Sequence, residues 1–290
     1  MENTNNITST IIETINTIFK NIFTSIDSSL YEVLDDLVFI NNDILSDKYF
    51  NKIFGTSTAN GVLLIANSLL IGILIYFGAK SMMANFTYNK IESPQQFVFK
   101  CIIYVICMNC SFFIIEQIIN LNYNICSLIR GLGEDIFGKN ICFTNLIKQI
   151  NSTYESANNI DMFSLDGLIQ GTLRISLLNL LFSYSLRYVL IKVLVLLSPF
   201  AILSLVLENT SHFFKSWYKS LFSLLFIQIF VSLVLLLLFA TDYSKEDTMN
   251  KFIYLGGIYT LIRANSIVKE LFGGISTSVQ SGITSLKLRN

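Results

Sequence analysis

The feature that most constrains this chain is a run of twenty uncharged residues from Leu221 to Ala240. A helix rises about 1.5 Å per residue, so the run is long enough to cross the roughly 30 Å hydrocarbon core of a bilayer. The run therefore predicts a transmembrane helix. The other elements of the chain are expected to pack around this crossing.

The composition is typical of a protein that crosses the membrane several times. Of the 290 residues, 52% are hydrophobic and only 14% are charged. The formal net charge is zero, with 20 basic and 20 acidic residues, so no overall basic field points to nucleic acid or anionic lipid. We expect an all-α, polytopic membrane bundle with about five transmembrane helices.

Five apolar segments are the candidates for these crossings. The third is too long for one crossing, so it either extends beyond the membrane or breaks at Pro199. The fifth begins with only eleven uncharged residues, from Phe252 to Ile262, so it either crosses the membrane or is re-entrant. The segments are 61–79, 97–119, 175–207, 221–240 and 252–272.

The distribution of Lys and Arg among the loops predicts the orientation. These residues are about twice as dense in 80–100, 208–219 and 263–290 as in the other loops, and basic loops face the cytoplasm. We therefore expect the N-terminus outside and the C-terminus in the cytoplasm. The resulting regions are an extracellular amphipathic helical region (1–57), transmembrane helices 1 and 2 (58–119), an extracellular polar helical loop (120–172), transmembrane helices 3 to 5 with a cytoplasmic aromatic hinge at 208–219 (173–272), and a cytoplasmic tail (273–290).

An apolar stripe marks the N-terminal region. Ile11, Ile15, Ile18, Ile22 and Ile26 recur at the three- and four-residue spacing of one helix face. Such a helix could lie on a membrane surface, pack on a partner protein, or dock on the chain's own bundle. The sequence leaves these alternatives open.

Four charged residues in the apolar segments are candidates for channel-lining or intramembrane ion-pair roles: Arg187, Lys192, Arg263 and Glu116. A charge deep in the bilayer costs at least about 2.5 kcal/mol unless it reaches water or a partner. Arg187 and Lys192 are predicted near the outer interface, within reach of water. Arg263 is predicted near the midplane, where it pairs with Glu116, faces an aqueous lumen, or belongs to a re-entrant segment.

The hinge at 208–219 combines aromatic and basic residues. Phe213 and Trp217 are aromatic, while Lys215 and Lys219 lie four residues apart on the other side of a helix. Aromatic rings favour the headgroup level of a membrane and lysine stems extend to water. The hinge is predicted to be either a simple interface anchor or a docking site for a cytoplasmic protein.

The chain offers little for catalysis or for a cofactor. Cys107 and Cys110 have a metal-like spacing, but no second pair follows, so we interpret them as small apolar residues and expect no metal or other cofactor. No catalytic pair is evident in facing spans, which excludes the common intramembrane enzymes. A disulfide between Cys126 and Cys142 depends on whether their loop faces an oxidising space.

Three stretches resemble the TrbL-type family of conjugal-transfer proteins, the polytopic inner-membrane subunits of type IV secretion systems. They resemble the family's Pro-terminated span, its Trp-containing cytoplasmic turn and its Gly-rich last segment, and with the order of the parts they cover about half of the chain. The tail is shorter than in family members with long cytoplasmic tails. The stretches are LLSPFAILSL, HFFKSWYKSLFSLLF and GGIYTLIRANSIVKELFGG.

The resemblance implies a channel or scaffold subunit in the bacterial cytoplasmic membrane that helps to pass DNA or protein. Its implied partners are other type IV secretion subunits including a cytoplasmic ATPase, further copies of the chain, bilayer lipid, and DNA in transit against the external loop. The ATPase would be the protein that docks on the hinge. The alternative function is a stand-alone transporter or ion channel, although no internal repeat typical of transporters is evident.

Overall fold

The computed structural model describes Thr14, Thr17 and residues 28–41, 43–55, 60–87, 93–155, 165–207, 210–241 and 248–272. The stripe predicted at 11–26, the tip of the polar loop at 156–164 and the tail at 273–290 lie outside these residues. Within them every regular element is a helix. The helices are α2 (Ser28–Val38), α3 (Asp43–Ser46), α4 (Lys48–Phe54), α5 (Val62–Thr87), α6 (Pro94–Asn109), α7 (Ser111–Phe137), α8 (Phe143–Glu155), α9 (Leu165–Leu196), α10 (Ser198–Leu203), α11 (Ser211–Ala240) and α12 (Thr248–Phe272).

Four of the described helices are long and apolar enough to cross a membrane. The prediction of an all-α membrane bundle is therefore confirmed, with four candidate spans. The fifth predicted segment forms α12, which is not among these four. The candidate spans are Val62–Met83, Ser111–Phe137, Gly171–Leu196 and Ser211–Ala240.

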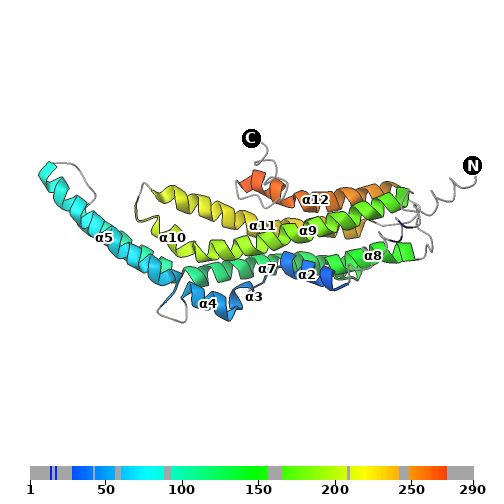
Figure 1. The fold of residues 1–290 in the computed structure, drawn as a ribbon, viewed down its shortest axis with the longest axis horizontal. Coiled ribbons are helices and arrows are strands. Elements are labelled where there is room, and N and C mark those ends of the chain that lie inside the picture. The colour runs from blue at the N-terminus through cyan, green and yellow to red at the C-terminus, as the bar shows by residue number, and fades with distance from the viewer. Residues whose placement is uncertain are drawn as a thin grey trace, which may run out of the picture.

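The main bundle is built around α11, with α7, α9 and α12 packed along it (Figure 1). Leu224, Val231 and Leu235 of α11 are fully buried, and their spacing of seven and four residues places them on one face. The facing stripe of α12 includes Tyr254, Ile258 and Leu261. Because it packs along both α9 and α11, α12 lies at the depth of the apolar helices although its own composition is more polar.

The boundary between the second apolar segment and the polar loop lies further along the chain than predicted. The helix predicted over 97–119 breaks at Cys110, and α7 then continues through residues assigned to the external loop as far as Phe137. The physical reason is an apolar face that persists beyond Ile119, on which Cys126 is also buried. Gly138, with φ 64°, ends α7 in the left-handed conformation that glycine adopts freely.

A second, smaller apolar cluster joins α5, α6 and α10 at the end of the bundle where α11 begins. It contains Ala66 of α5, Phe97 of α6 and Leu203 of α10, and Phe97 stacks on Phe77 with ring centroids 3.5 Å apart. The long third segment breaks at Leu197, just before Pro199, because proline is tolerated in the first turn of a helix but not in its interior.

The hairpin of α5 and α6 is stacked on the end of the bundle, and α5 projects beyond it (Figure 1). The orientation predicted from the sequence puts the start of α5 and the hinge at 208–219 on opposite sides of the membrane. That orientation requires α5 to lie beside the bundle. At 26 and 30 residues, α5 and α11 are each longer than the roughly 30 Å hydrocarbon core. One bilayer therefore accommodates both in this arrangement only if the hairpin is strongly tilted.

The described part of the N-terminal region docks on the chain's own bundle. Val38, Ile44 and Phe54 are buried in the same apolar core as α9 and α11. Asp35 of α2 also binds the start of α8, since its carboxylate accepts hydrogen bonds from the backbone N–H of Phe143 at 2.7 Å, and from the N–H and Oγ1 of Thr144 at 3.1 and 2.7 Å. This carboxylate joins α2 to the polar loop.

Replacing Asp35 with Asn should weaken this junction, because the amide has a single acceptor oxygen and its NH₂ meets N–H donors. We expect the free energy of unfolding to fall by about 1 to 2 kcal/mol, as for a lost helix cap.

Burial raises the pKa of Asp35 above its usual 3.8, against the opposing effect of its hydrogen bonds. The folded protein thus binds the proton of the Asp35 carboxyl more tightly than the unfolded chain does. The stability that this proton contributes is therefore lost as pH rises from 3.8 through the raised pKa.

Thermal unfolding of the detergent-solubilised wild type and Asp35→Asn variant over this pH range measures both effects. The difference between the two proteins removes the contribution of other groups. An identical pH slope in the variant would contradict the assignment to Asp35.

Two adjacent glycines test the packing of α12 on α11. A Cβ at Gly257 would overlap the side chain of Leu238, whereas a Cβ at Gly256 meets nothing within 4 Å. Gly257→Val should therefore destabilise the protein by about 1 to 3 kcal/mol more than Gly256→Val, since both carry the same helix propensity change. Thermal unfolding of the two variants measures this, and equal stabilities would show that the helices do not pack this closely.

Candidate functional site: a buried arginine in the bundle

Arg187 of α9 is fully buried between helices, and its guanidinium hydrogen-bonds to backbone carbonyls. Its Nε donates to the carbonyl of Leu224 in α11 at 2.8 Å, and its Nη1 donates to the carbonyl of Val38 at 3.0 Å. The ring of Tyr184 lies 5.9 Å from the Cζ. Within the described residues Nη2 has no hydrogen-bond partner. Among the described residues, only neutral groups thus surround this cation.

One of the two carbonyls that accept hydrogen bonds from Arg187 lies at the end of a helix. Val38 is the last residue of α2, and the last carbonyls of a helix lack partners within it. The carbonyl of Ile40 accepts a hydrogen bond from Nε2 of Gln228 at 3.3 Å, and Oε1 of Gln228 accepts one from Asn122 at 3.1 Å. Non-helical backbone is tolerated at membrane depth only where protein groups satisfy it, and Arg187 and Gln228 do so here.

The expectation that Arg187 reaches the membrane interface is wrong. Its helix face points into the bundle, where the end of α2 fills the space beside it. Lys192, five residues further along α9, lies on another face. Its Nζ is 3.9 Å from the carboxylate of Asp47, which caps α4, and 5.1 Å from the ring centroid of Tyr188.

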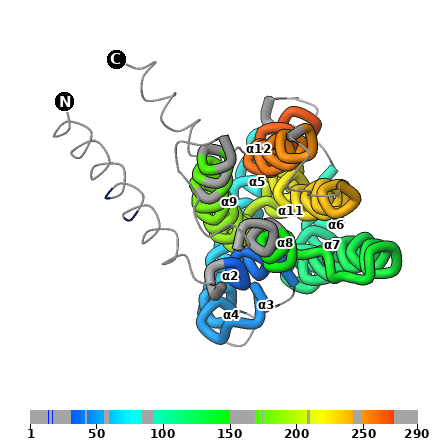
Figure 2. Tube along the Cα trace, turned by 90° about the vertical axis from the view of Figure 1, so that its right-hand side faces the viewer, coloured from blue at the N-terminus to red at the C-terminus, as the bar shows by residue number. Residues whose placement is uncertain are grey.

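Arg263 and Glu116 are not brought together. Arg263 is exposed on α12, with its Cζ 5.3 Å from the ring centroid of Tyr259. Glu116 is half-buried on α7, and Figure 2 shows α7 and α12 on different sides of α11. No ion pair links the two residues in the described part of the chain. Of the four predicted charges, Arg187 and Lys192 thus hold the N-terminal segment, while Arg263 lies on the outer surface.

The hinge forms the first turns of α11, and its residues divide by face. Trp217 is only 8% exposed, and its Nε1 donates to the carbonyl of Leu194 at 2.8 Å. The prediction that Trp217 belongs to an exposed docking surface is therefore wrong. Phe213, Lys215 and Lys219 are exposed and remain the outward face of the hinge. Residues 208 and 209 lie outside the described part.

The sequence analysis missed the amides that share the buried site. Gln228 is the one amide in the twenty-residue apolar run, and polar residues in spans usually face the bundle interior, so this signal was present. Asn265 of α12 similarly donates to Ser183 Oγ of α9 at 3.1 Å. Such amide contacts join neighbouring helices in a medium without water.

The cysteines are free thiols. Cys126 and Cys142 are both buried and are not joined by a disulfide, and burial raises the pKa of the Cys142 thiol. Cys110 is exposed and Cys107 is half-buried. No group of three or more His, Cys, Asp or Glu side chains gathers in the described part of the chain.

Comparisons of the chain with protein-family models, with curated proteins and with solved structures give no match. The chemistry of the buried site must therefore be inferred from its geometry. Its cation is enclosed and hydrogen-bonded to backbone, which suits it to hold the end of α2 against α9 and α11.

We expect Arg187→Met to loosen the N-terminal segment, because the Val38 carbonyl then loses its buried donor. An unsatisfied buried group costs about 1 to 3 kcal/mol, which corresponds to roughly five-fold to 150-fold faster amide exchange in α3 and α4. Hydrogen exchange followed by mass spectrometry measures it. The control Lys192→Met removes only a partly exposed ion pair worth at most about 1 kcal/mol. Equal protection in wild type and Arg187→Met would contradict this role.

Proposed function

We propose that this protein is a membrane channel or scaffold subunit of a conjugation-type (type IV) secretion system in the bacterial cytoplasmic membrane. It would help to pass DNA or protein across that membrane. The resemblance of its Pro-terminated span, aromatic hinge and Gly-rich last segment to TrbL-type proteins supports the family. The all-α membrane bundle supports the class of protein.

The observation that carries the proposal is the exposed guanidinium of Arg263. It lies eleven residues after Phe252, or roughly 16 Å along a helix that packs against the two apolar helices α9 and α11. An exposed charge at such depth needs water or a polar partner. Since the described residues offer Arg263 no carboxylate, this face of α12 would meet another subunit or an aqueous path. An assembly of subunits provides either one.

We further propose five crossings, with α12 as the fifth, the N-terminus outside and the C-terminus in the cytoplasm. This topology needs α5 beside the bundle instead of stacked on its end. The breaks at Cys110 and Leu197 lie on two of the connections between the hairpin cluster and the bundle. Rotation there would bring the α5–α6 hairpin alongside α11 in the assembled membrane complex.

The exposed side of the hinge is the proposed docking surface for a cytoplasmic ATPase. Phe213, Lys215 and Lys219 form it, while Trp217 anchors the turn from within. Copies of the chain, other secretion subunits and bilayer lipid would complete the surroundings of the bundle. Transported DNA would pass the polar loop that begins after Phe137.

Arg263→Leu should accumulate to the wild-type level, because the side chain is exposed, but should lose DNA or protein transfer and weaken co-purification of secretion subunits. Arg263→Lys should keep part of both, since it keeps the charge. The matched control is Lys269→Leu, an exposed cation near the end of the same helix. Transfer, immunoblots and affinity purification of the tagged protein measure these effects.

Wild-type transfer by Arg263→Leu at normal abundance would exclude a role for this charge. A loss of abundance that Glu116→Leu restores would instead indicate a structural ion pair. A tagged wild-type protein that transports a solute alone, without any secretion ATPase bound, would favour the stand-alone transporter.

A further inference from the structure

Helix α7 carries a polar face on the outside of the bundle. Gln117, Asn124 and Ser127 are exposed there, and Asn120 and Gly131 are half-buried between them. Successive members of this set lie three or four residues apart, which places all five on one side of the helix. The buried residues of α7 lie on another side, so this polar face points away from α11.

The polar face lies at membrane depth. Asn122 donates a hydrogen bond to Gln228 of α11, and a Cβ at Gly133 would lie 3.0 Å from the side chain of Leu236. These two contacts place the middle of α7 beside the twenty-residue uncharged run of α11. Polar side chains at such a depth usually face protein or water and seldom face lipid.

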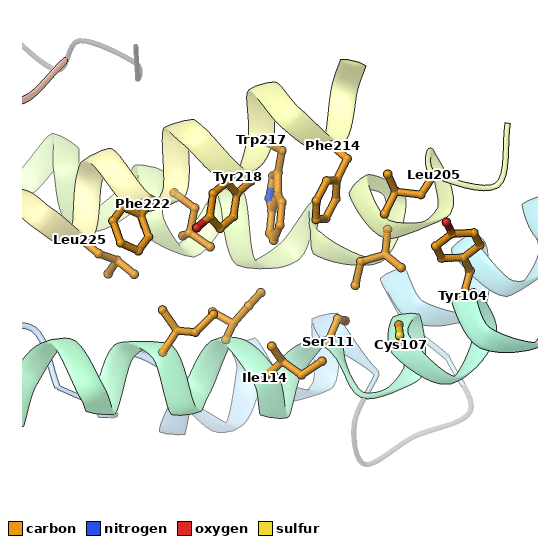
Figure 3. Close-up of a pocket in the computed structure, with 14 residues that line it drawn as sticks. Tyr104, Cys107, Ser111, Ile114, Leu205, Phe214, Trp217, Tyr218, Phe222 and Leu225 are labelled. Atoms are coloured by element: carbon orange, nitrogen blue, oxygen red, sulfur yellow. The ribbon is translucent and has the colours of Figure 1, made fainter. Parts of the chain in front are cut away.

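The first turns of α7 and α11 also lie side by side. They face each other across an apolar cavity of about 300 Å³, with Ile114 on one side and Trp217 and Phe222 on the other (Figure 3). The two helices therefore run parallel over their length. Levels along α7 can then be read against levels along α11.

Arg263 lies at the level of this polar face, on another side of the protomer. Helix α12 runs antiparallel to α11, since Gly257 lies against Leu238 and the end of α12 contacts the middle of α11. Arg263 follows Gly257 by about six residues and thus lies near the level of Ser232, which is also the level of Ser127. Figure 2 shows α7 and α12 on different sides of α11.

The two faces are chemically complementary. A guanidinium only donates hydrogen bonds, whereas amide and hydroxyl oxygens accept them. Glu116 and Glu134 lie near the two ends of the polar face of α7. Arg130, the one basic residue of α7, is half-buried and bonds to the loop after the helix. Gly256, two turns before Arg263 on α12, leaves room for another helix to approach closely.

We propose that α12 of one copy packs on the polar face of α7 of the next copy, where Arg263 donates hydrogen bonds to Asn124 and Ser127 of its neighbour. The contact joins two different faces of identical chains, and such contacts form a ring when the rotation closes. One interface thus gives a partner to both polar features that the protomer exposes at membrane depth. It rests on the proposed function, since it is the contact that Arg263 makes in that assembly.

Disulfide cross-linking between introduced cysteines tests the interface. A Cβ meets nothing within 4 Å at Gly131 of α7 or at Gly256 of α12, so cysteine fits at both positions. The double variant Gly131→Cys with Gly256→Cys is made in a Cys110→Ala background, which removes the exposed native thiol. It is oxidised in membranes of cells that express this chain and no other secretion subunit. We expect a ladder of dimers, trimers and larger products on a non-reducing gel.

Further cysteine variants check the register. Gln117→Cys with Glu270→Cys lies at matching levels of the two faces and should give the same ladder. Gly131→Cys with Glu270→Cys places the thiols roughly 15 Å apart along the helices and should give no product. Each single cysteine should also give none, because the contact joins different faces.

Substitutions in the cross-linking background test the polar contact itself. Arg263→Leu should lower the association constant roughly ten-fold or more, because hydrogen bonds to a charged group are lost. Asn124→Leu should also lower it, and the swap Arg263→Asn with Asn124→Arg should restore part of the loss. Lys269→Leu is the matched control. The cross-linked fraction at decreasing density of protein in the membrane measures these effects.

Dimers from Gly256→Cys alone would show that α12 meets α12 and would overturn the proposal. So would an absence of product from both matched pairs, equal yields from matched and mismatched pairs, or undiminished cross-linking in Arg263→Leu. A ladder combined with wild-type transfer by Arg263→Leu would support the interface and reject the secretion function. Loss of transfer by Arg263→Leu without any ladder would reject the interface and leave that function standing.

Discussion

The fold depends on one interaction, the hydrogen bonds from the buried guanidinium of Arg187 to backbone carbonyls of α11 and of the end of α2. The end of a helix inside an apolar bundle leaves carbonyls that no water can reach, and each is costly if unsatisfied. Arginine suits this place because its planar fork presents several donors in fixed directions and is weakly hydrated. Gln228 has the same role two residues after Val38, where its side-chain amide donates to the carbonyl of Ile40.

The same residue type has opposite surroundings at two positions. Arg187 points inward, and carbonyls of the chain accept two of its hydrogen bonds, so it stabilises the protomer. Arg263 points outward from α12, with an aromatic ring and, among the described residues, no carboxylate beside it. A charge of the second kind is stable at membrane depth only in an assembly or beside water. The contrast is the physical basis for the proposal that the chain belongs to a larger membrane complex.

The junction between the bundle and the α5–α6 hairpin gathers the irregular features of the molecule. Two of the connections break there, at Cys110 and Leu197, and the cavity lined by Trp217 lies against them. Side chains alone do not fill this junction. The exposed face of the hinge lies on the same first turns of α11.

The sequence by itself determined the all-α class and the candidate spans, because a twenty-residue uncharged run and an apolar composition favour helices that cross a bilayer. It also located the apolar runs of α5, α9 and α11 and offered a break near Pro199 as one of two alternatives, since helix length, proline and periodicity are local properties. It misplaced the second span, whose helix breaks at Cys110. It could not place Arg187, Gln228 or Trp217, because their partners at Val38, Ile40 and Leu194 are backbone carbonyls, which have no sequence signature. Only tertiary packing decided which face of each helix is enclosed. For that reason it alone distinguished the arginine that holds the fold from the one that faces outward.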